Sequence, residues 1–316
     1  MNYYAGIDLG GTNIKCGIVD EEGKIIIQES VPTHSERGFS YVAETMAGLV
    51  IKLAQVNKID VKEVGVGSPG MIDGERGVVV YSNNLAWQKA PLAAELKNRL
   101  RLPVRITNDA NAAAYGEYAC GAGKQYNSIV LLTLGTGIGS GIVLNGKLYE
   151  GSAGAGAELG HEVIRMGGEK CACGRRGCFE AYASATALIR QTKRAMEKDR
   201  QSTLWRLCEG DINNVNGKTV FDAVAMGDAA AKRVINNYRR YLSEGLANIA
   251  NAFRPEAILI GGGISAQGEN LTKPLQKRVD KLMLGHGAYA PVKIKTASLG
   301  NAAGLVGAAM LAKEKI

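Results

Sequence analysis

The stretch YAGIDLGGTNIKCGIVDEEGKII, residues 4–26, decides the fold. An apolar strand, a glycine turn, a second strand and a further turn at Glu22 and Gly23 follow one another in it. The same pattern returns in SIVLLTLGTGIGSGIVLNGKL, residues 128–148, with Gly and Thr in the turn, Gly-Ile-Val in the second strand and a Gly-Lys turn after it. The separation of the two stretches along the sequence is too long for the repeat of a solenoid. The repeated pattern therefore predicts duplication of a whole domain core. The two glycine turns could then hold opposite sides of one ligand.

Strands and helices alternate over the rest of the chain, which predicts an α/β protein. Apolar residues at helical spacing follow Ser40, a possible helix cap. In LPVRITNDANAAAYGEYACG, residues 102–121, a strand leads into an alanine-rich helix that begins near Asp109 and ends at Gly121. A long helix is expected after Asp228, with an apolar face that includes Val234, Ile235, Tyr238, Leu242 and Leu246. A small-residue helix is expected from Asn301 onward.

Length and composition are those of a soluble globular protein with two domains. The chain has 316 residues, of which 46% are hydrophobic and 22% charged. We expect a smaller lobe of residues 1–112 plus 301–316 and a larger lobe of residues 113–300 that contains a metal-binding segment, 161–178. Both lobes would be α/β.

The charge pattern and the amino terminus point to a cytoplasmic protein. Lys and Arg number 38 against 30 Asp and Glu, but the basic residues are scattered, which favours a solvated surface over a nucleic-acid partner. The amino terminus has no signal-peptide pattern. The uncharged run 125–146 is split by LGTGIGSG, so it is better read as two strands than as a membrane span.

A cluster of metal-binding side chains lies in GHEVIRMGGEKCACGRRGCFE, residues 160–180. His161, Cys171, Cys173 and Cys178 supply one imidazole and three thiols, which is enough for a closed tetrahedral zinc site. Gly174 and Gly177 would let the chain fold tightly around the metal. The alternatives are a disulfide framework or ordinary buried thiols.

Three glycine turns each follow an apolar strand. Exposed backbone amides in such turns can hold phosphate oxygens, because no side chain blocks the approach. A single turn of this kind is more simply a tight structural turn, but three in one chain favour nucleotide binding. The pattern is neither a Walker A loop nor the dinucleotide motif. The turns are Gly10-Gly11-Thr12, Gly135-Thr136-Gly137-Ile138-Gly139 and Gly261-Gly262-Gly263.

Three motifs together resemble the ROK family of sugar kinases and related repressors: GIDLGGTNIKCGIV, LLTLGTGIGSGIVLNGKLYEGSAGAGAELGH and CACGRRGCFE. The resemblance covers essentially the whole chain. It implies a two-lobed actin-like ATPase fold, of the ribonuclease H-like and hexokinase-like type, with a duplicated core and a structural zinc site.

The resemblance implies where ATP and Mg²⁺ would bind. The ATP phosphates would lie against the first two glycine turns, and the third turn would approach the adenosine. Asp8 would hold the magnesium ion or its waters, although a simple carboxylate at a strand end is the alternative. The residues assigned to the cofactors are Asp8, Gly10, Gly11, Thr12, Lys15, Gly135, Thr136, Gly137, Gly139, Gly261, Gly262 and Gly263.

By the same resemblance, Asp109 would be the general base that takes the proton from a sugar hydroxyl. A helix start favours its ionised form, although an ordinary helix cap is the alternative. If one nitrogen of His161 binds zinc, the other can donate to the sugar. Solvated surface carboxylates are the alternative for Glu158 and Glu180. Sugar-binding residues implied in this way are Gly70, Asn83, Asn84, Asn108, Asp109, Glu158, His161 and Glu180, with the choice between Asn83 and Asn84 open.

The activity implied is an ATP-dependent hexose kinase that phosphorylates the 6-hydroxyl of glucose, in a homodimer or homotetramer. Kinases for N-acetylmannosamine, fructose, allose or glucosamine are alternatives, because one or two hydrogen bonds can decide the sugar. A transcriptional repressor is a different class. It is disfavoured because the first glycine turn lies too near the start of the sequence for a DNA-binding domain to precede it. A non-catalytic sugar sensor is disfavoured because Asp8, Asp109 and the glycine turns are all present.

Overall fold

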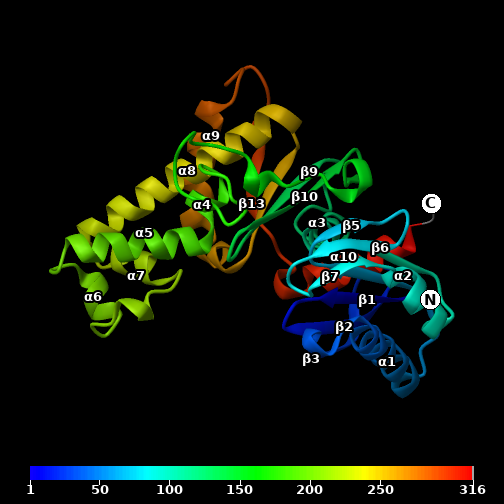
Figure 1. The fold of residues 1–316 in the computed structure, drawn as a ribbon. Coiled ribbons are helices and arrows are strands. Elements are labelled where there is room, and N and C mark those ends of the chain that lie inside the picture. The colour runs from blue at the N-terminus through cyan, green and yellow to red at the C-terminus, as the bar shows by residue number, and fades with distance from the viewer. Residues whose placement is uncertain (315–316) are drawn as a thin grey trace. The chain divides into compact units, whose positions relative to one another are not determined.

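The structure is a computed structural model, and it describes residues 1–314 of the chain. Strands and helices alternate along it, which confirms the predicted α/β class (Figure 1). The last two residues of the expected smaller lobe, 315–316, lie outside the described residues. Within residues 1–314, no helix has both the length and the apolar character needed to cross a membrane.

The first sheet is built from the amino-terminal hairpin. Its strand order is β3-β2-β1-β4-β8, with β1 antiparallel to β2 and parallel to β4. This register places Asp8 of β1 opposite Lys15 of β2 and Gly67 of β4. The strands are β1 (Tyr3–Leu9), β2 (Asn13–Asp20), β3 (Ile25–Pro32), β4 (Val61–Ser68) and β8 (Val104–Asn108).

Helices cover this sheet, and α10 packs directly on β1, β4 and α3 (Figure 1). The cap expected at Ser40 is wrong, because α1 has Gly38 at its N-cap position and Ser40 lies inside the helix, where its hydroxyl accepts from Arg99. A small antiparallel sheet, β5-β6-β7, follows β4 in the chain. These elements are α1 (Phe39–Asn57), β5 (Met71–Asp73), β6 (Val78–Ser82), β7 (Trp87–Ala90), α2 (Leu92–Leu100), α3 (Asp109–Cys120) and α10 (Ala303–Lys313).

The second five-stranded sheet has the order β11-β10-β9-β12-β13. In both sheets, three consecutive strands run in reverse order along the sheet and two later strands extend the other edge. The predicted duplication of the core is therefore visible as a repeated strand order. The strands are β9 (Ile129–Leu134), β10 (Ile138–Leu144), β11 (Lys147–Tyr149), β12 (Ala257–Gly261) and β13 (Lys293–Thr296).

The long helix predicted after Asp228 is α8, and its apolar face is buried as expected. Asp228 caps it, because the carboxylate accepts from the amide of Ala231 at 2.7 Å. The other helices of this half are α4 (Glu180–Ala183), α5 (Ala185–Lys198), α6 (Thr203–Leu207), α7 (Thr219–Ala225), α8 (Ala229–Phe253) and α9 (Glu269–Leu282). Short 3-10 helices are η1 (Ser35–Arg37), η2 (Ser152–Gly154), η3 (Leu159–His161), η4 (Ile212–Asn214), η5 (Gly263–Gln267) and η6 (Gly300–Ala302).

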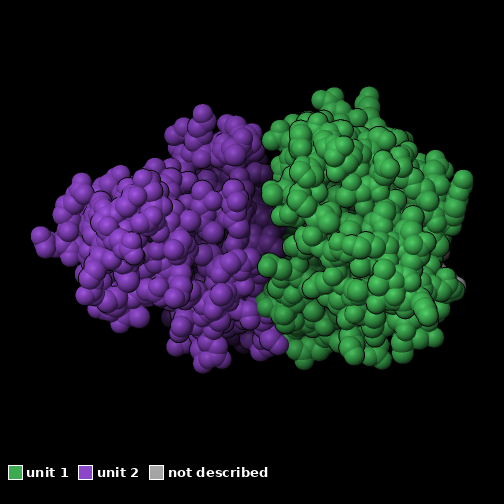
Figure 2. All heavy atoms as spheres, turned by 90° about the horizontal axis from the view of Figure 1, so that it is seen from below, with its two compact units in different colours: residues 1–131, 140–157, 297–316 green, residues 132–139, 158–296 purple. Residues whose placement is uncertain are grey.

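The chain forms two compact units, coloured separately in Figure 2. Unit 1 consists of residues 1–131, 140–157 and 297–316, and unit 2 of residues 132–139 and 158–296. Helix α3 belongs to unit 1, where it packs against α10. The chain passes between the units within β9, within β10, before Glu158 and after Thr296.

Candidate active site and metal centre

In unit 1, the first glycine turn joins β1 to β2. The amide of Gly10 donates to the carbonyl of Asn13 at 2.9 Å, and the hydroxyl of Thr33 donates to the carbonyl of Gly10 at 2.7 Å. Asp8 and Lys15 stand beside the turn as an ion pair, with 3.4 Å between Oδ2 and Nζ. Both side chains are partly exposed, so a bound cation or phosphate could exchange with either partner.

Asn108 caps helix α3. Its Oδ1 accepts from the amides of Ala110 at 2.8 Å and Asn111 at 3.3 Å, and its Nδ2 donates to the carbonyl of Gly70 at 3.1 Å. Asp109, the next residue, also accepts from the amide of Ala110, at 2.9 Å. The structure therefore gives the capping role to Asn108 and places Asp109 in the first turn, where the helix dipole favours a carboxylate.

Gly70 lies against Asn108, and Asn84 lies against the first glycine turn. Gly70 has φ +114°, and a Cβ there would overlap the carbonyl of Tyr81, so the position requires glycine. A Cβ on Gly11 would lie 3.3 Å from that of Asn84, which places Asn84 against the first glycine turn. Asn83 and Asn84 are both exposed, and only Asn84 has this contact. Unit 1 thus contains both the predicted magnesium-binding residue, Asp8, and the predicted base, Asp109.

In unit 2, the second glycine turn joins β9 to β10 and lies against two other segments. Gly262, in the third glycine turn, has φ +80°, and a Cβ there would overlap the carbonyl of Leu134, the residue before Gly135. The carboxylate of Glu180 lies over Gly137 and accepts from the amide of Ile138 at 3.3 Å. The second and third turns are therefore neighbours, and Glu180 contacts one of them.

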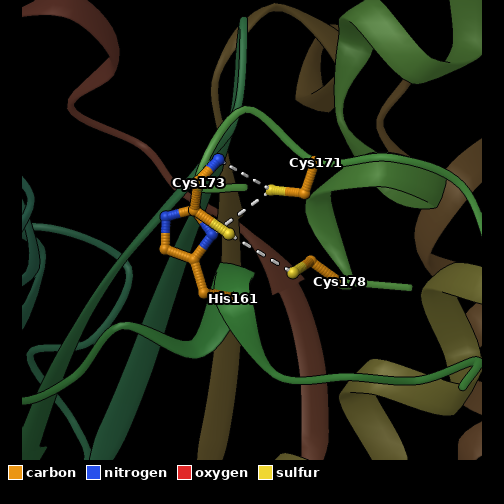
Figure 3. Close-up of side chains that lie close together, drawn as sticks. All are labelled: His161, Cys171, Cys173 and Cys178. Carbon is orange, nitrogen blue, oxygen red and sulfur yellow. Dashed lines mark hydrogen bonds between the residues drawn. The ribbon is translucent and has the colours of Figure 1, made fainter. Parts of the chain in front are cut away.

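The four predicted metal ligands converge in unit 2 (Figure 3). Their ligand atoms all lie within 4.8 Å of one another. The sulfurs of Cys173 and Cys178 are 3.7 Å apart, and Cys171 Sγ is 3.6 Å from His161 Nδ1. Two thiolates bound to one tetrahedral zinc at 2.3 Å would be about 3.8 Å apart, so the spacing fits this ion.

The backbone around the cluster folds as expected. Gly174 and Gly177 both have φ +89°, a left-handed conformation that glycine adopts without strain. A Cβ on Gly177 would overlap the carbonyl of Arg165. All six cysteines are free thiols, so the alternative of a disulfide framework is not what the structure contains.

Protonation of the thiols differs across the cluster. Burial raises the pKa of Cys171, and a hydrogen bond to Glu180 raises it further; burial also raises the pKa of Cys178. A hydrogen bond from the backbone of Arg175 lowers the pKa of Cys173. Because zinc binds thiolates, metal binding at neutral pH would displace protons from Cys171 and Cys178.

Glu180 connects the metal cluster to the glycine turn. One oxygen accepts from Cys171 Sγ at 3.0 Å and lies 3.7 Å from His161 Nδ1, while the other accepts from Ile138. His161 belongs to η3, and its amide donates to the carbonyl of Glu158 at 3.0 Å. His161 turns Nδ1 toward the sulfurs, so its second nitrogen, Nε2, is the one available for another partner.

Sequence reasoning missed two residues of unit 1, Gly304 and Glu117. Gly304 of α10 lies against Asp8: a Cβ there would be 3.1 Å from the carboxyl carbon. Glu117 is a fully buried carboxylate in α3, eight residues after Asp109. The only signal for Gly304 was the small-residue character of the last helix, and Glu117 had no signal.

A repeated five-stranded order with a glycine turn in each half places the protein among the actin-like ATPase folds. A sequence model of the ROK family matches residues 4–315. The chain belongs to the ROK family.

The relatives include both enzymes and regulators. A glucokinase from Streptomyces coelicolor is 38% identical, over 99% of this chain and 98% of the relative. The crystal structure of a ROK family glucokinase from Streptomyces griseus in complex with glucose and AMPPNP has a TM-score of 0.83 at 36% identity, covering 99% of this chain and 100% of that one. A xylose repressor from Bacillus spizizenii is 32% identical, over 83% of this chain and 64% of the repressor.

Proposed function

We propose that this protein is an ATP-dependent glucokinase that transfers the terminal phosphate of ATP to the 6-hydroxyl of glucose. The observation that carries the proposal is a match to glucokinases along nearly the whole length of both chains. The similarity to the repressor covers less of either chain and has lower identity. The enzyme would work in the cytoplasm as a homodimer or homotetramer.

Asp109 is the general base of the proposed reaction. It stands in the first turn of α3, where the backbone amides favour the ionised form that accepts a proton. Asn108 fulfils the capping role, so Asp109 is not required to hold the helix start. Phosphoryl transfer needs little covalent help from the protein, so alignment of the hydroxyl with the terminal phosphate supplies most of the rate.

The glycine turns hold ATP in this proposal. Backbone amides at Gly10–Thr12 and Gly135–Gly139 cradle the phosphates, and the turn at Gly261–Gly263 approaches the adenosine. Lys15 contacts a phosphate from the strand beside Asp8. Asp8 fits Mg²⁺ because its carboxylate is partly exposed and hard cations prefer carboxylate and water oxygens. The ion would supply charge neutralisation on the phosphates.

The sugar is held by a set of amides and carboxylates whose hydrogen bonds have fixed directions. Asn84 is favoured over Asn83, because it lies against the first glycine turn. Gly70 leaves room for a close approach, and His161 contributes Nε2. The remaining groups of the set are Asn108, Asp109, Glu158 and Glu180.

His161, Cys171, Cys173 and Cys178 hold a structural zinc ion in this proposal. The spacing of the ligand atoms fits a closed tetrahedral site, which leaves no open position for chemistry. The role of the ion would be to fold the segment and to fix the ring orientation and tautomer of His161.

The test of the proposed function is a comparison of specificity constants. The purified protein is assayed with ATP and Mg²⁺ against glucose, N-acetylmannosamine, fructose, allose and glucosamine, with detection of ADP and of the phosphorylated sugar. We expect the highest kcat/KM with glucose and product phosphorylated at the 6-hydroxyl. A higher kcat/KM with another sugar would reassign the substrate. Absence of turnover with every sugar, together with sequence-specific DNA binding, would favour a regulator.

A further inference from the structure

Glu117 is a buried carboxylate to which the proposed function gives no role. It lies in α3, has no exposed surface and accepts four hydrogen bonds. Oε1 accepts from the amides of Ser298 at 2.8 Å and Leu299 at 2.6 Å. Oε2 accepts from the amide of Ala122 at 2.9 Å and the hydroxyl of Ser298 at 3.2 Å. Burial of a carboxylate is costly unless it is satisfied in this way.

Glu117 holds residues 298–299, which precede helix α10 in the chain. Unit 2 ends at Thr296, and residues 297–299 lead through η6 into α10. Glu117 is separated from Ser298 by 181 positions in sequence. The carboxylate therefore fixes the start of α10 relative to α3 through a contact that no local signal imposes.

Helices α3 and α10 also meet backbone against backbone. A Cβ on Gly116 would overlap the carbonyl of Ala303, and a Cβ on Gly307 would overlap that of Ala112. Such close packing transmits a small displacement of one helix directly to the other, because dense interiors have few voids to absorb it.

Helix α3 carries the proposed base, and α10 packs on strand β1, which carries the proposed magnesium-binding carboxylate, Asp8. Asp109 is the first residue of α3, and Gly304 of α10 lies against Asp8. Because Gly304 of α10 lies against the carboxyl group of Asp8, a displacement of α10 relative to α3 would shift that side chain relative to the proposed base. All of these contacts lie within unit 1.

We propose that Glu117 is a positioning residue for phosphoryl transfer: by tying residues 298–299 to α3, it sets the separation of Asp109 and Asp8. The inference rests on the proposed function for its catalytic consequence. The structural claim, that Glu117 ties residues 298–299 to α3, is independent of that function.

The variant Glu117→Gln tests the charge with little change of shape. All partners of Glu117 are donors, and three are backbone amides that cannot reverse their role. A glutamine has one acceptor oxygen and one NH₂ group. Since each oxygen of Glu117 accepts from at least one backbone amide, the NH₂ group would have to face a backbone N–H. We expect residues 298–299 to loosen.

The matched control is Asp228→Asn in unit 2. Asp228 is also a buried carboxylate that accepts from two amides and a hydroxyl, those of Ala231, Thr203 and Ser202. It has no contact with α3 or α10 among these bonds. Both variants lose one acceptor oxygen, so a general loss of stability should affect them alike.

Both variants are assayed at a temperature at which circular dichroism shows them folded. For Glu117→Gln we expect kcat to fall about 10- to 100-fold, because a displacement of reacting groups by about 1 Å costs rates of this size. KM for glucose should stay near that of the unaltered protein, since the transition state and not sugar binding is affected. Amide exchange at Ser298 and Leu299 should be faster. Asp228→Asn should leave both kcat and the amide exchange at Ser298 and Leu299 unchanged.

The outcomes separate this inference from the proposed function. Equal kcat in Glu117→Gln and Asp228→Asn, or unchanged exchange at residues 298–299 in Glu117→Gln, would overturn it. If the unaltered protein phosphorylates no hexose, the proposed function fails, and the exchange measurement still decides whether Glu117 holds this segment. If Glu117→Gln does not fold, Ser298→Ala replaces it. That variant removes one of the four hydrogen bonds and should lower kcat in the same direction by a smaller factor.

Discussion

Asp109 is the first residue of helix α3, and the N-cap residue is Asn108, which accepts from the amides of Ala110 and Asn111. At the scale of the residue, helix capping and proton abstraction are therefore assigned to two different side chains, Asn108 and Asp109. The capping bond is worth about 1 kcal/mol, and it would survive a change at Asp109. Catalysis and helix stability can therefore be tested independently.

For Asp109→Asn, we expect kcat to fall at least about a hundredfold, because the amide keeps the shape of the side chain and cannot accept the proton. The melting temperature should stay close to that of the unaltered protein. Steady-state kinetics and scanning calorimetry measure the two effects. Asp211→Asn, at the start of η4, is the control and should keep full activity. Near-normal turnover of Asp109→Asn would remove the role of general base.

At the scale of the element, the zinc-binding segment has little regular structure of its own to hold it. It has no regular strand or helix between η3 and α4, and its pairing is limited to isolated bridges such as that of Val163 with Cys178. A zinc ion contributes roughly 10 to 16 kcal/mol to isolated zinc modules, which is comparable with the stability of a whole domain. The metal would therefore hold this segment together.

For Cys173→Ser, we expect loss of about one zinc per chain and a melting temperature lower by more than about 5 °C. Cys208→Ser is the control, since Cys208 is a free thiol that lies outside the metal cluster. Metal content is measured by mass spectrometry and melting by calorimetry. A protein that contains no zinc when purified, or that melts unchanged after complete chelation, would contradict the proposal.

The start of helix α8 gives a prediction for pH. Burial alone would raise the pKa of Asp228, but hydrogen bonds from Ala231, Ser202 and Thr203 outweigh it and lower the pKa below 3.8. A carboxyl with a lowered folded-state pKa stabilises the protein above its unfolded value, and this contribution is lost as the pH falls through the folded value.

Asp228→Asn should therefore be less stable than the unaltered protein at pH 7 by about 1–3 kcal/mol, because a buried donor loses its acceptor. The difference should stay constant down to about pH 5 and shrink below the unfolded value near 3.8. Urea unfolding at a series of pH values measures it. A difference that grows on acidification would show that the sign is wrong.

At the scale of the whole molecule, the proposed reaction requires water to be excluded from the transferred phosphate. We expect glucose to bring the two lobes together, which small-angle X-ray scattering would detect as a smaller radius of gyration. A sugar that is not phosphorylated is the control. An unchanged radius at saturating glucose would contradict closure. The bodies that would move in this step are the two lobes expected from the sequence, residues 1–112 with 301–316 and residues 113–300. These lobe boundaries stay a prediction.

Much of the architecture could be predicted because its signals are local. The two related hairpin motifs predicted the duplicated core, and the spacing of His161, Cys171, Cys173 and Cys178 predicted the metal cluster. Contacts between distant positions had no such signal. The bond of Glu117 to Ser298, the approach of Gly304 to Asp8 and the bond of Glu180 to Ile138 each depend on how whole elements pack.

The separation of cap and base has a practical consequence. A chain that cannot catalyse but folds normally keeps the other sugar-binding groups, and the amide of Asn can still hydrogen-bond to a sugar hydroxyl. Asp109→Asn would therefore provide a reagentless glucose probe once a fluorophore is attached. It would report the ligand without consuming it or requiring nucleotide turnover. The engineering would begin from a helix start whose cap, Asn108, is left in place.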